Sequence, residues 1–234
     1  MYSGNTRGDG EQTVIQFLSY ILNQHTPTYG NRNSFSIEKK SDISRGDIAN
    51  DSFISTTVHV GTHIDMPYHF YQDGQTIKDF DDSFWLFEKI LIIEIVPQCI
   101  IIKDELIKKL ENVTNKECEL LIVKTGICNI RDRDEFWSQN FGFHPTIYNY
   151  LIEKYPNLRV LGFDSISVSS FSNRLLGREA HKQFLNPEKP ILLLEDMDLR
   201  AVNDKDVFEK IIIAPLRIEE CDGLPCSVIG IKND

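Results

Sequence analysis

Residues 59–70 of the chain read HVGTHIDMPYHF, and this stretch decides how the rest of the sequence is interpreted. Three of the chain's six histidines, His59, His63 and His69, gather here around one carboxylate, Asp65. Imidazole nitrogens and carboxylate oxygens are the usual ligands of a catalytic first-row metal ion. A glycine and a proline in the same stretch favour an irregular, pre-shaped loop over a helix. We therefore interpret it as the core of a metal-dependent hydrolase site.

The spacing within this stretch indicates how its side chains could converge. His59, His63 and Asp65 are separated by even numbers of residues, so in a strand all three would point to the same side. We expect a strand that runs into a loop, with Gly61 where the backbone must pass close to a metal ion or substrate. His69 could be a further ligand, or a base held beside a metal-bound water.

A catalytic metal ion also needs partners from elsewhere in the chain, and two distant residues are candidates. Glu195 follows the apolar run 191–194, at the carboxyl end of an expected strand, where sites of α/β proteins usually lie. It could equally be a solvated loop acid. His181 precedes another apolar stretch. We assign neither His25 nor His144 to a metal ion.

The rest of the chain alternates short apolar β-rich runs with helical patterns. Continuous apolar runs are typical of strands that are covered on both faces. The pattern predicts one α/β domain over residues 1–234, with helices against a largely buried sheet. The segment 13–22 is compatible with either helix or strand. Strands are predicted at 53–58, 90–96, 120–124, 160–163, 191–194, 211–213 and 228–231, and helices at 103–110 and 146–154.

Composition excludes several classes of protein. The 234 residues carry a net charge of −10, from 25 basic and 35 acidic residues, which argues against binding nucleic acid or an anionic membrane surface. The longest apolar run, 90–96, is too short to cross a bilayer. The first residues lack the apolar core of a secretory signal. Five cysteines without a CxxC pair predict reduced thiols and a cytoplasmic protein.

The HVGTHIDMPYHF stretch resembles the HxGTHxDxPxH signature of the cyclase-like metal-dependent hydrolases, the family that includes bacterial kynurenine formamidases. Further segments resemble other motifs of this family, in the same order along nearly the whole chain. They are 26–30 (TPxYPG), 124–126 (RTG), 161–168 (GIDTxSVD), 194–197 (ENL), and 215–218 with 222–225 (PLxI and DGSP).

The resemblance implies a swivelling β/β/α fold, a homodimer or homotetramer, and one or two zinc or manganese ions per subunit. By position, His59, His63 and Asp65 would bind the first ion. Asp65, His181 and Glu195 would complete a second site. These assignments come from the resemblance and not from the spacing alone.

The resemblance also assigns His69 as the general acid/base. Tyr29 is a candidate for substrate binding, because its ring could stack on an aromatic substrate, and a solvated turn tyrosine fits the sequence equally well. Three departures from the family pattern concern the pocket rather than the ligands. Ser169 stands where an aspartate is frequent, and Ser227 where an arginine is common. The turn 29–31 replaces an aromatic-Pro-Gly turn, so substrate specificity depends on residues that differ here.

The reaction implied by these residues is hydrolysis of a C–N amide bond of a small molecule by a metal-activated water. We expect an aryl formamide such as N-formylkynurenine, which belongs to tryptophan catabolism. The alternatives are a lactam or lactone hydrolase of the isatin type, a polyketide-type cyclase, and a metal-binding member without turnover. The presence of His69 beside the ligands argues against the last.

Overall fold

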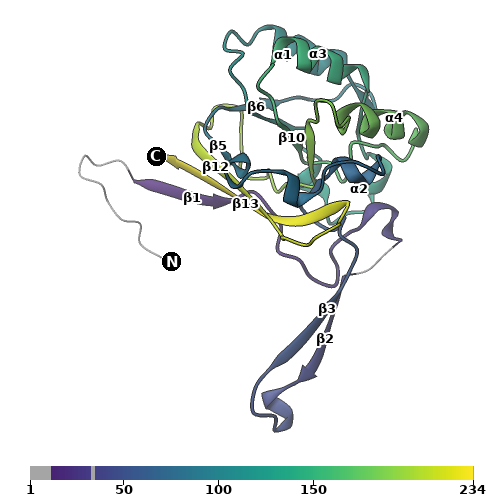
Figure 1. Ribbon diagram of the computed structural model, residues 1–234, viewed down its shortest axis with the longest axis vertical. Coiled ribbons are helices and arrows are strands. Elements are labelled where there is room, and N and C mark those ends of the chain that lie inside the picture. Colours follow the sequence, from purple (N-terminus) through teal and green to yellow (C-terminus); the bar gives the residue numbers. More distant parts are fainter. Residues whose placement is uncertain (1–11, 33–34, 234) are drawn as a thin grey trace.

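The computed structural model describes residues 12–32 and 35–233, and a nine-stranded sheet organises them (Figure 1). Eight strands follow one another in the order β5-β12-β13-β4-β11-β10-β8-β6, and β1 pairs with β13. Their bounds are β1 Thr13–Phe17, β4 His63–Asp65, β5 Leu86–Phe87, β6 Ile90–Glu94, β8 Leu120–Lys124, β10 Val160–Phe163, β11 Leu192–Glu195, β12 Phe208–Pro215 and β13 Gly223–Asn233.

One half of this sheet is parallel. β10 lies between β8 and β11 and is parallel to both, and β6 is parallel to β8. Every residue of β8, β10 and β11 is buried, which explains why these segments read as continuous apolar runs. The strands predicted at 120–124 and 160–163 are confirmed residue for residue.

The three-residue strand β4 joins this parallel half to the antiparallel half. It pairs antiparallel with β11 on one side and with the first three residues of β13, Gly223 to Pro225, on the other. The later residues of β13 pair with β12 and β1. The segment that carries His63 and Asp65 therefore lies inside the sheet, between strands from the carboxyl-terminal third of the chain.

Helices occupy the connections between the parallel strands: α1 follows β6, α2 and α3 follow β8, and α4 follows β10. The helix predicted at 146–154 is confirmed, and α1 is shifted by one residue from 103–110. α4 was not predicted; it is amphipathic and buries Gly177, Ala180, His181 and Phe184. The bounds are α1 Asp104–Glu111, α2 Glu135–Ser138, α3 Thr146–Lys154 and α4 Arg174–Phe184.

Short 3-10 turns complete the connections, and two of them flank the site described below. The bounds are η1 Tyr29–Asn31, η2 Ile43–Arg45, η3 Pro67–His69, η4 Ile77–Asp79, η5 Asp82–Trp85 and η6 Ile127–Ile130. A separate parallel pair is formed by β7 (Ile101–Ile102) and β9 (Gly142–Phe143).

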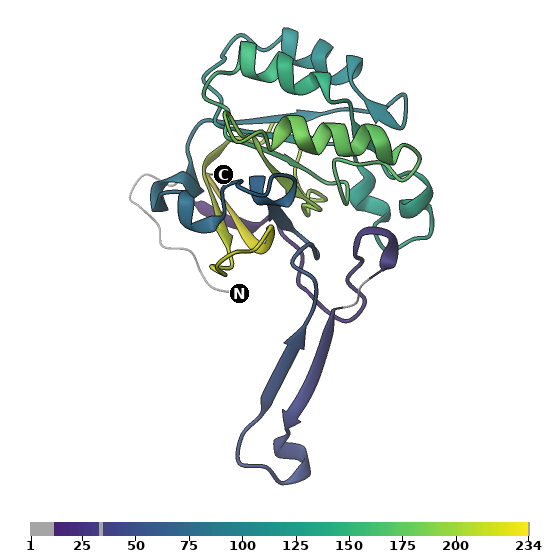
Figure 2. The same cartoon turned by 45° about the vertical axis from the view of Figure 1, so that its right-hand side comes forward.

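An antiparallel ribbon projects from the body of the molecule (Figures 1 and 2). It consists of β2 (Ser36–Ser41) and β3 (Asp51–Ser55), and we call residues 36–55 the arm. The strand predicted at 53–58 is corrected here: the strand ends at Ser55 and is exposed along its whole length. Residues 56–62 then run irregularly towards β4, so no strand extends from this ribbon through His59.

Within residues 12–32 and 35–233, none of the helices has both the length and the apolar character needed to span a lipid bilayer.

Candidate metal centre

A cavity of about 320 Å³ opens beside the β4–β11 junction. All seven residues that the sequence singled out line it, although they come from six separate segments. They are Tyr29, His59, His63, Asp65, His69, His181 and Glu195.

The sheet itself brings three of these side chains together. His63 and Asp65 are two residues apart in β4, so they point to the same face. Glu195, the last residue of β11, is paired directly with His63 in the antiparallel register. All three are buried. The predicted strand-end position of Glu195 is confirmed, and the long-range pairing places its carboxylate against the histidine.

Two histidines face two carboxylates across a small gap. His63 Nε2 lies 3.5 Å from Asp65 Oδ1 and 3.4 Å from Glu195 Oε2. His181 Nε2, from α4, lies 3.5 Å from Asp65 Oδ2 and 3.8 Å from Glu195 Oε1. These separations exceed those of good hydrogen bonds. Among the described residues, His63 Nε2 and Asp65 Oδ2 are buried without a hydrogen-bond partner.

The other nitrogen of each ring is held by the backbone. His63 Nδ1 donates to the carbonyl oxygen of Gly61 at 2.8 Å, and His181 Nδ1 donates to that of Gly177 at 2.9 Å. In the neutral rings this leaves the lone pair on Nε2, directed at the carboxylates. Such a backbone bond is the usual way to fix the tautomer of a metal-binding histidine. The residues present therefore fit a divalent metal ion.

The electrostatics of the cluster point to the same chemistry. Burial opposes the charged form of His63, but the nearby carboxylates of Asp65 and Glu195 raise its pKa well above the usual value. For Asp65, burial raises the pKa, but the charge and hydrogen bond of His59 and the close approach of His181 and His63 hold it well below the usual value. Protons and metal cations compete for such atoms, so a site that holds protons tightly can also hold a cation.

Glu195 is fixed from behind by the β10–α4 connection. The backbone N–H of Val168 donates to Oε1 at 2.7 Å, and the Ser167 hydroxyl approaches it at 3.4 Å. The next residue, Asp196, has a φ of 52° and pairs with Arg131 at the buried end of the strand. These contacts orient the Glu195 carboxylate towards the cavity.

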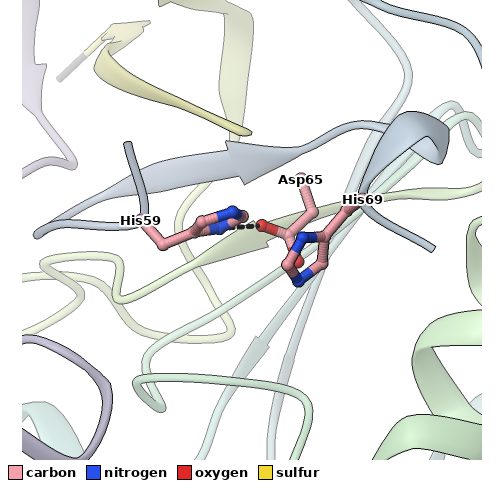
Figure 3. A group of neighbouring side chains, drawn as sticks. All are labelled: His59, Asp65 and His69. Carbon is pink, nitrogen blue, oxygen red and sulfur yellow. Dashed lines mark hydrogen bonds and ion pairs between the residues drawn. The ribbon is translucent and has the colours of Figure 1, made fainter. Parts of the chain in front are cut away.

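His59 and His69 share a carboxylate that the sequence interpretation did not single out. His59 Nδ1 donates to Asp65 Oδ1 at 2.8 Å, and its Nε2 donates to Asp222 Oδ2 at 2.9 Å. His69 Nδ1 donates to the same Asp222 oxygen at 2.8 Å. Figure 3 shows His59 pointing at Asp65, with His69 close by, and the two imidazole rings lie 4.3 Å apart.

Asp222 directly precedes β13, which explains how a residue so distant in sequence enters the site. The only available signal was its position at the head of the segment 222–225, whose motif was used for the resemblance but not for chemistry. Hydrogen bonds from His59 and His69 hold the pKa of Asp222 well below the usual range. Burial lowers the pKa of His59, but the charge of Asp65 and hydrogen bonds to Asp222 and Asp65 outweigh it and raise the pKa to about 9.

Gly61 combines a left-handed backbone conformation with a close contact to another segment. Gly61 has a φ of 57°, a left-handed conformation that favours glycine. A Cβ at this position would lie 2.3 Å from Leu22 Cδ2. The backbone at Gly61 therefore passes close to the amino-terminal segment of the chain, and Gly61 also lines the cavity. The positive φ also interrupts the strand between His59 and His63.

Aromatic and hydroxyl side chains form the outer wall. Tyr29, in η1, packs against Phe171 with ring centroids 4.4 Å apart. Ser169, one of the departures from the family pattern, places its hydroxyl 3.3 Å from His181 Nδ1. It thus faces the nitrogen that points away from the carboxylates. The other departure, Ser227, lies on β13 outside this cavity.

Comparison with known proteins agrees with this architecture. Residues 17–170 match the Cyclase family model, whose description is "Putative cyclase". A kynurenine formamidase from Bacillus cereus is 29% identical over 212 residues, covering 91% of this chain and 94% of that protein. A kynurenine formamidase from Bacillus anthracis is 29% identical over 213 residues, with the same coverage.

Two solved structures share the fold. Isatin hydrolase A from Labrenzia aggregata, bound to benzyl benzoate, superposes with a TM-score of 0.79 at 19% identity, covering 95% of this chain and 94% of that one. A potential metal-dependent hydrolase with cyclase activity gives 0.73 at 18% identity, covering 95% and 99%. These likenesses confirm the predicted cyclase-like α/β fold. With the family model matching well over half of its length, the chain belongs to the cyclase family.

Proposed function

We propose that the chain is a metal-dependent hydrolase that cleaves the C–N bond of an aryl formamide such as N-formylkynurenine. One observation carries this proposal: among the residues that the structure describes, His63 Nε2 and Asp65 Oδ2 are buried without a hydrogen-bond partner, and both residues line the cavity together with Glu195. Burying such groups is costly unless a partner satisfies them, and a cation suits both. The relatives named kynurenine formamidase support an amide as the substrate.

For the metal ions, we propose that His59, His63 and Asp65 hold one and that His181 and Glu195, with Asp65, hold a second. Nitrogen and oxygen donors of this kind suit zinc or manganese. A divalent ion supplies a hydroxide at neutral pH by lowering the pKa of bound water from ~15.7 towards ~7. Because both ring nitrogens of His59 donate to carboxylates, His59 must give up a proton and one of these bonds to become a ligand.

His69 is the group that we propose to move protons. Asp222 accepts the hydrogen bond from His69 Nδ1, which fixes the ring and leaves Nε2 as the nitrogen that can take up a proton. His69 lines the cavity beside the carboxylate cluster. It can therefore collect a proton when water is activated and deliver it to the nitrogen that leaves, as a general acid/base does.

The test is a comparison of rates with N-formylkynurenine, isatin and phenyl acetate, on protein loaded in turn with zinc and manganese. We expect the formamide to be the preferred substrate. His69→Ala should keep its metal but lose about 10²–10⁴-fold in kcat, whereas His25→Ala, an exposed histidine outside the cavity, should change neither. A preference for isatin, or no turnover of the formamide with either metal, would reject the formamidase assignment.

We further propose that the protein is a single domain, located in the cytoplasm, that assembles as a homodimer or homotetramer. Strands from both ends of the chain, β1 and β13, pair in one sheet, which supports one domain. All five cysteines are unpaired, which supports a reducing compartment. The arm supports assembly, because an isolated two-stranded ribbon is marginally stable in water, and this one exposes Ile37, Phe53 and Ile54. A second copy of the chain would cover it.

A further inference from the structure

Three exposed arginines line the cavity and have no carboxylate partner in the part of the chain that the structure describes. Arg32, Arg174 and Arg178 all line the cavity that holds the carboxylate cluster. Across residues 12–32 and 35–233, no ion pair joins any of the three to an acidic side chain, although acidic residues outnumber basic ones by 35 to 25 in the whole chain. Arg131 and Arg200, by contrast, each hold an aspartate within 2.7 Å.

Helix α4 connects these arginines to the floor of the cavity. Arg174, Arg178 and His181 lie at positions i, i+4 and i+7 of α4, which share one face of a helix. His181 faces the carboxylates of Asp65 and Glu195, and Arg178 is about one turn, or ~5 Å, further towards the mouth. The same helix therefore presents an imidazole to the cluster and two guanidinium groups to whatever enters.

The charges of the three arginines converge on Tyr29. Burial raises the pKa of the Tyr29 phenol, and the positive charges of Arg174, Arg32 and Arg178 oppose that rise. Arg174 also lies 5.9 Å from the ring centre of Phe171, which packs on Tyr29. An aromatic wall and a group of cations thus occupy the same side of the cavity mouth.

We propose that Arg174 and Arg178, with Arg32, form a carboxylate-binding subsite that selects aromatic amides bearing an anionic group. This proposal rests on the proposed amide hydrolysis. Guanidinium groups bind carboxylates through paired, charge-assisted hydrogen bonds. The substrate carboxylate is therefore held at the mouth, its aromatic ring lies along Tyr29, and the amide points towards the cluster.

The test compares N-formylkynurenine with its α-carboxamide, which differs only in the charge of the carboxyl group. Arg174→Gln and Arg178→Gln should each raise KM for the carboxylate substrate about 10-fold and leave kcat nearly unchanged. For the carboxamide, KM should change less than about threefold. Arg217→Gln, an exposed arginine outside the cavity, is the matched control and should behave as the wild type. An equal change for both substrates, or no change for either, would overturn the subsite.

A binding measurement separates failure of the subsite from failure of the proposed reaction. If the wild type hydrolyses neither formamide, the proposed function fails, and the subsite is tested by titrating benzoate and benzamide into the metal-loaded protein. We expect benzoate to bind about 10-fold more tightly. The double variant Arg174→Gln/Arg178→Gln should lose this preference while its metal content stays unchanged. No preference for benzoate in the wild type, including no binding of either compound, would reject the subsite.

Discussion

At the scale of single residues, the chemistry of the site depends on which ring nitrogen of each histidine already makes a hydrogen bond. His63 and His181 each donate a hydrogen bond from one ring nitrogen to a backbone carbonyl, and the other ring nitrogen faces the carboxylates. Both ring nitrogens of His59 donate hydrogen bonds to carboxylates, and one ring nitrogen of His69 donates to Asp222. Because a hydrogen bond made by one ring nitrogen dictates the chemistry of the other, the partners matter as much as the histidines.

Replacement of the shared carboxylate by a neutral amide tests this arrangement. In Asp222→Asn the oxygen that accepts from both His59 and His69 loses its charge, so the rings are less well oriented. We expect kcat to fall about 10- to 100-fold, as for other residues that orient catalytic or ligating histidines, while the fold is retained. Steady-state kinetics with circular dichroism as a control on folding would measure this. A rate equal to that of the wild type would show that Asp222 does not orient His69.

A glycine on α4 provides a second test at this scale. A Cβ on Gly177 would lie 2.0 Å from Ser169 Oγ and 2.8 Å from its Cα. Gly177→Ala should therefore destabilise the protein by about 1–3 kcal/mol through overpacking, even though alanine is the better helix former. Thermal unfolding would measure the loss, with Glu179→Ala, at an exposed position on the same helix, as the control. An increase in Tm for Gly177→Ala would contradict the crowding.

At the scale of elements, strand β4 and the arm differ in how many neighbouring strands they pair with. β4 has only three residues, but it is held on both edges by β11 and β13. The arm is longer, but within residues 12–32 and 35–233 its strands β2 and β3 pair only with each other, and nearly all of their residues are exposed. The ladder contacts of β4 come from within the chain, whereas in the proposed assembly a second copy would supply the contacts that cover the arm.

Removal of the arm tests the proposed assembly. Replacement of residues 36–55 by a short Gly/Ser linker should leave the sheet folded but lower the molecular mass in solution from an oligomer to a monomer. Phe53→Asp, which charges an exposed arm position, should weaken assembly, whereas Val96→Asp, exposed on the body of the molecule, should not. Light scattering coupled to size exclusion would measure the mass. A monomeric wild type, or an oligomer that survives the deletion, would contradict the arm's role.

At the scale of the whole molecule, the two halves of the sheet meet at the carboxylate cluster. His63 and Asp65 come from the junction strand, Glu195 from the parallel half, and Asp222 from the connection into the antiparallel half. A cation bound between them would cross-link segments that are more than a hundred residues apart in sequence. The free energy of metal binding should therefore add to the stability of the entire fold.

Metal removal should lower the stability of the protein globally. With free metal at about 100 times its Kd, binding contributes about 2.7 kcal/mol, which corresponds to a Tm about 5–10 °C higher for a chain of this length. The increment should shrink as the pH falls, because protons compete with the metal ion for its ligand atoms. Scanning calorimetry with and without a chelator, at several pH values, would measure it. A Tm that is insensitive to the chelator would exclude a cross-linking ion.

The sequence by itself determined what depends on neighbours along the chain. The alternation of side chains in a strand was enough to put His63 and Asp65 on one face, and unbroken apolar runs were enough to locate β8 and β10. Tertiary structure alone decided the pairing of Glu195 with His63, the hydrogen bonds from His59 and His69 to Asp222, and the exposure of the arm. These features depend on strand register and on contacts between distant segments, and spacing within a sequence carries no information about which distant partner completes a hydrogen bond or covers a surface.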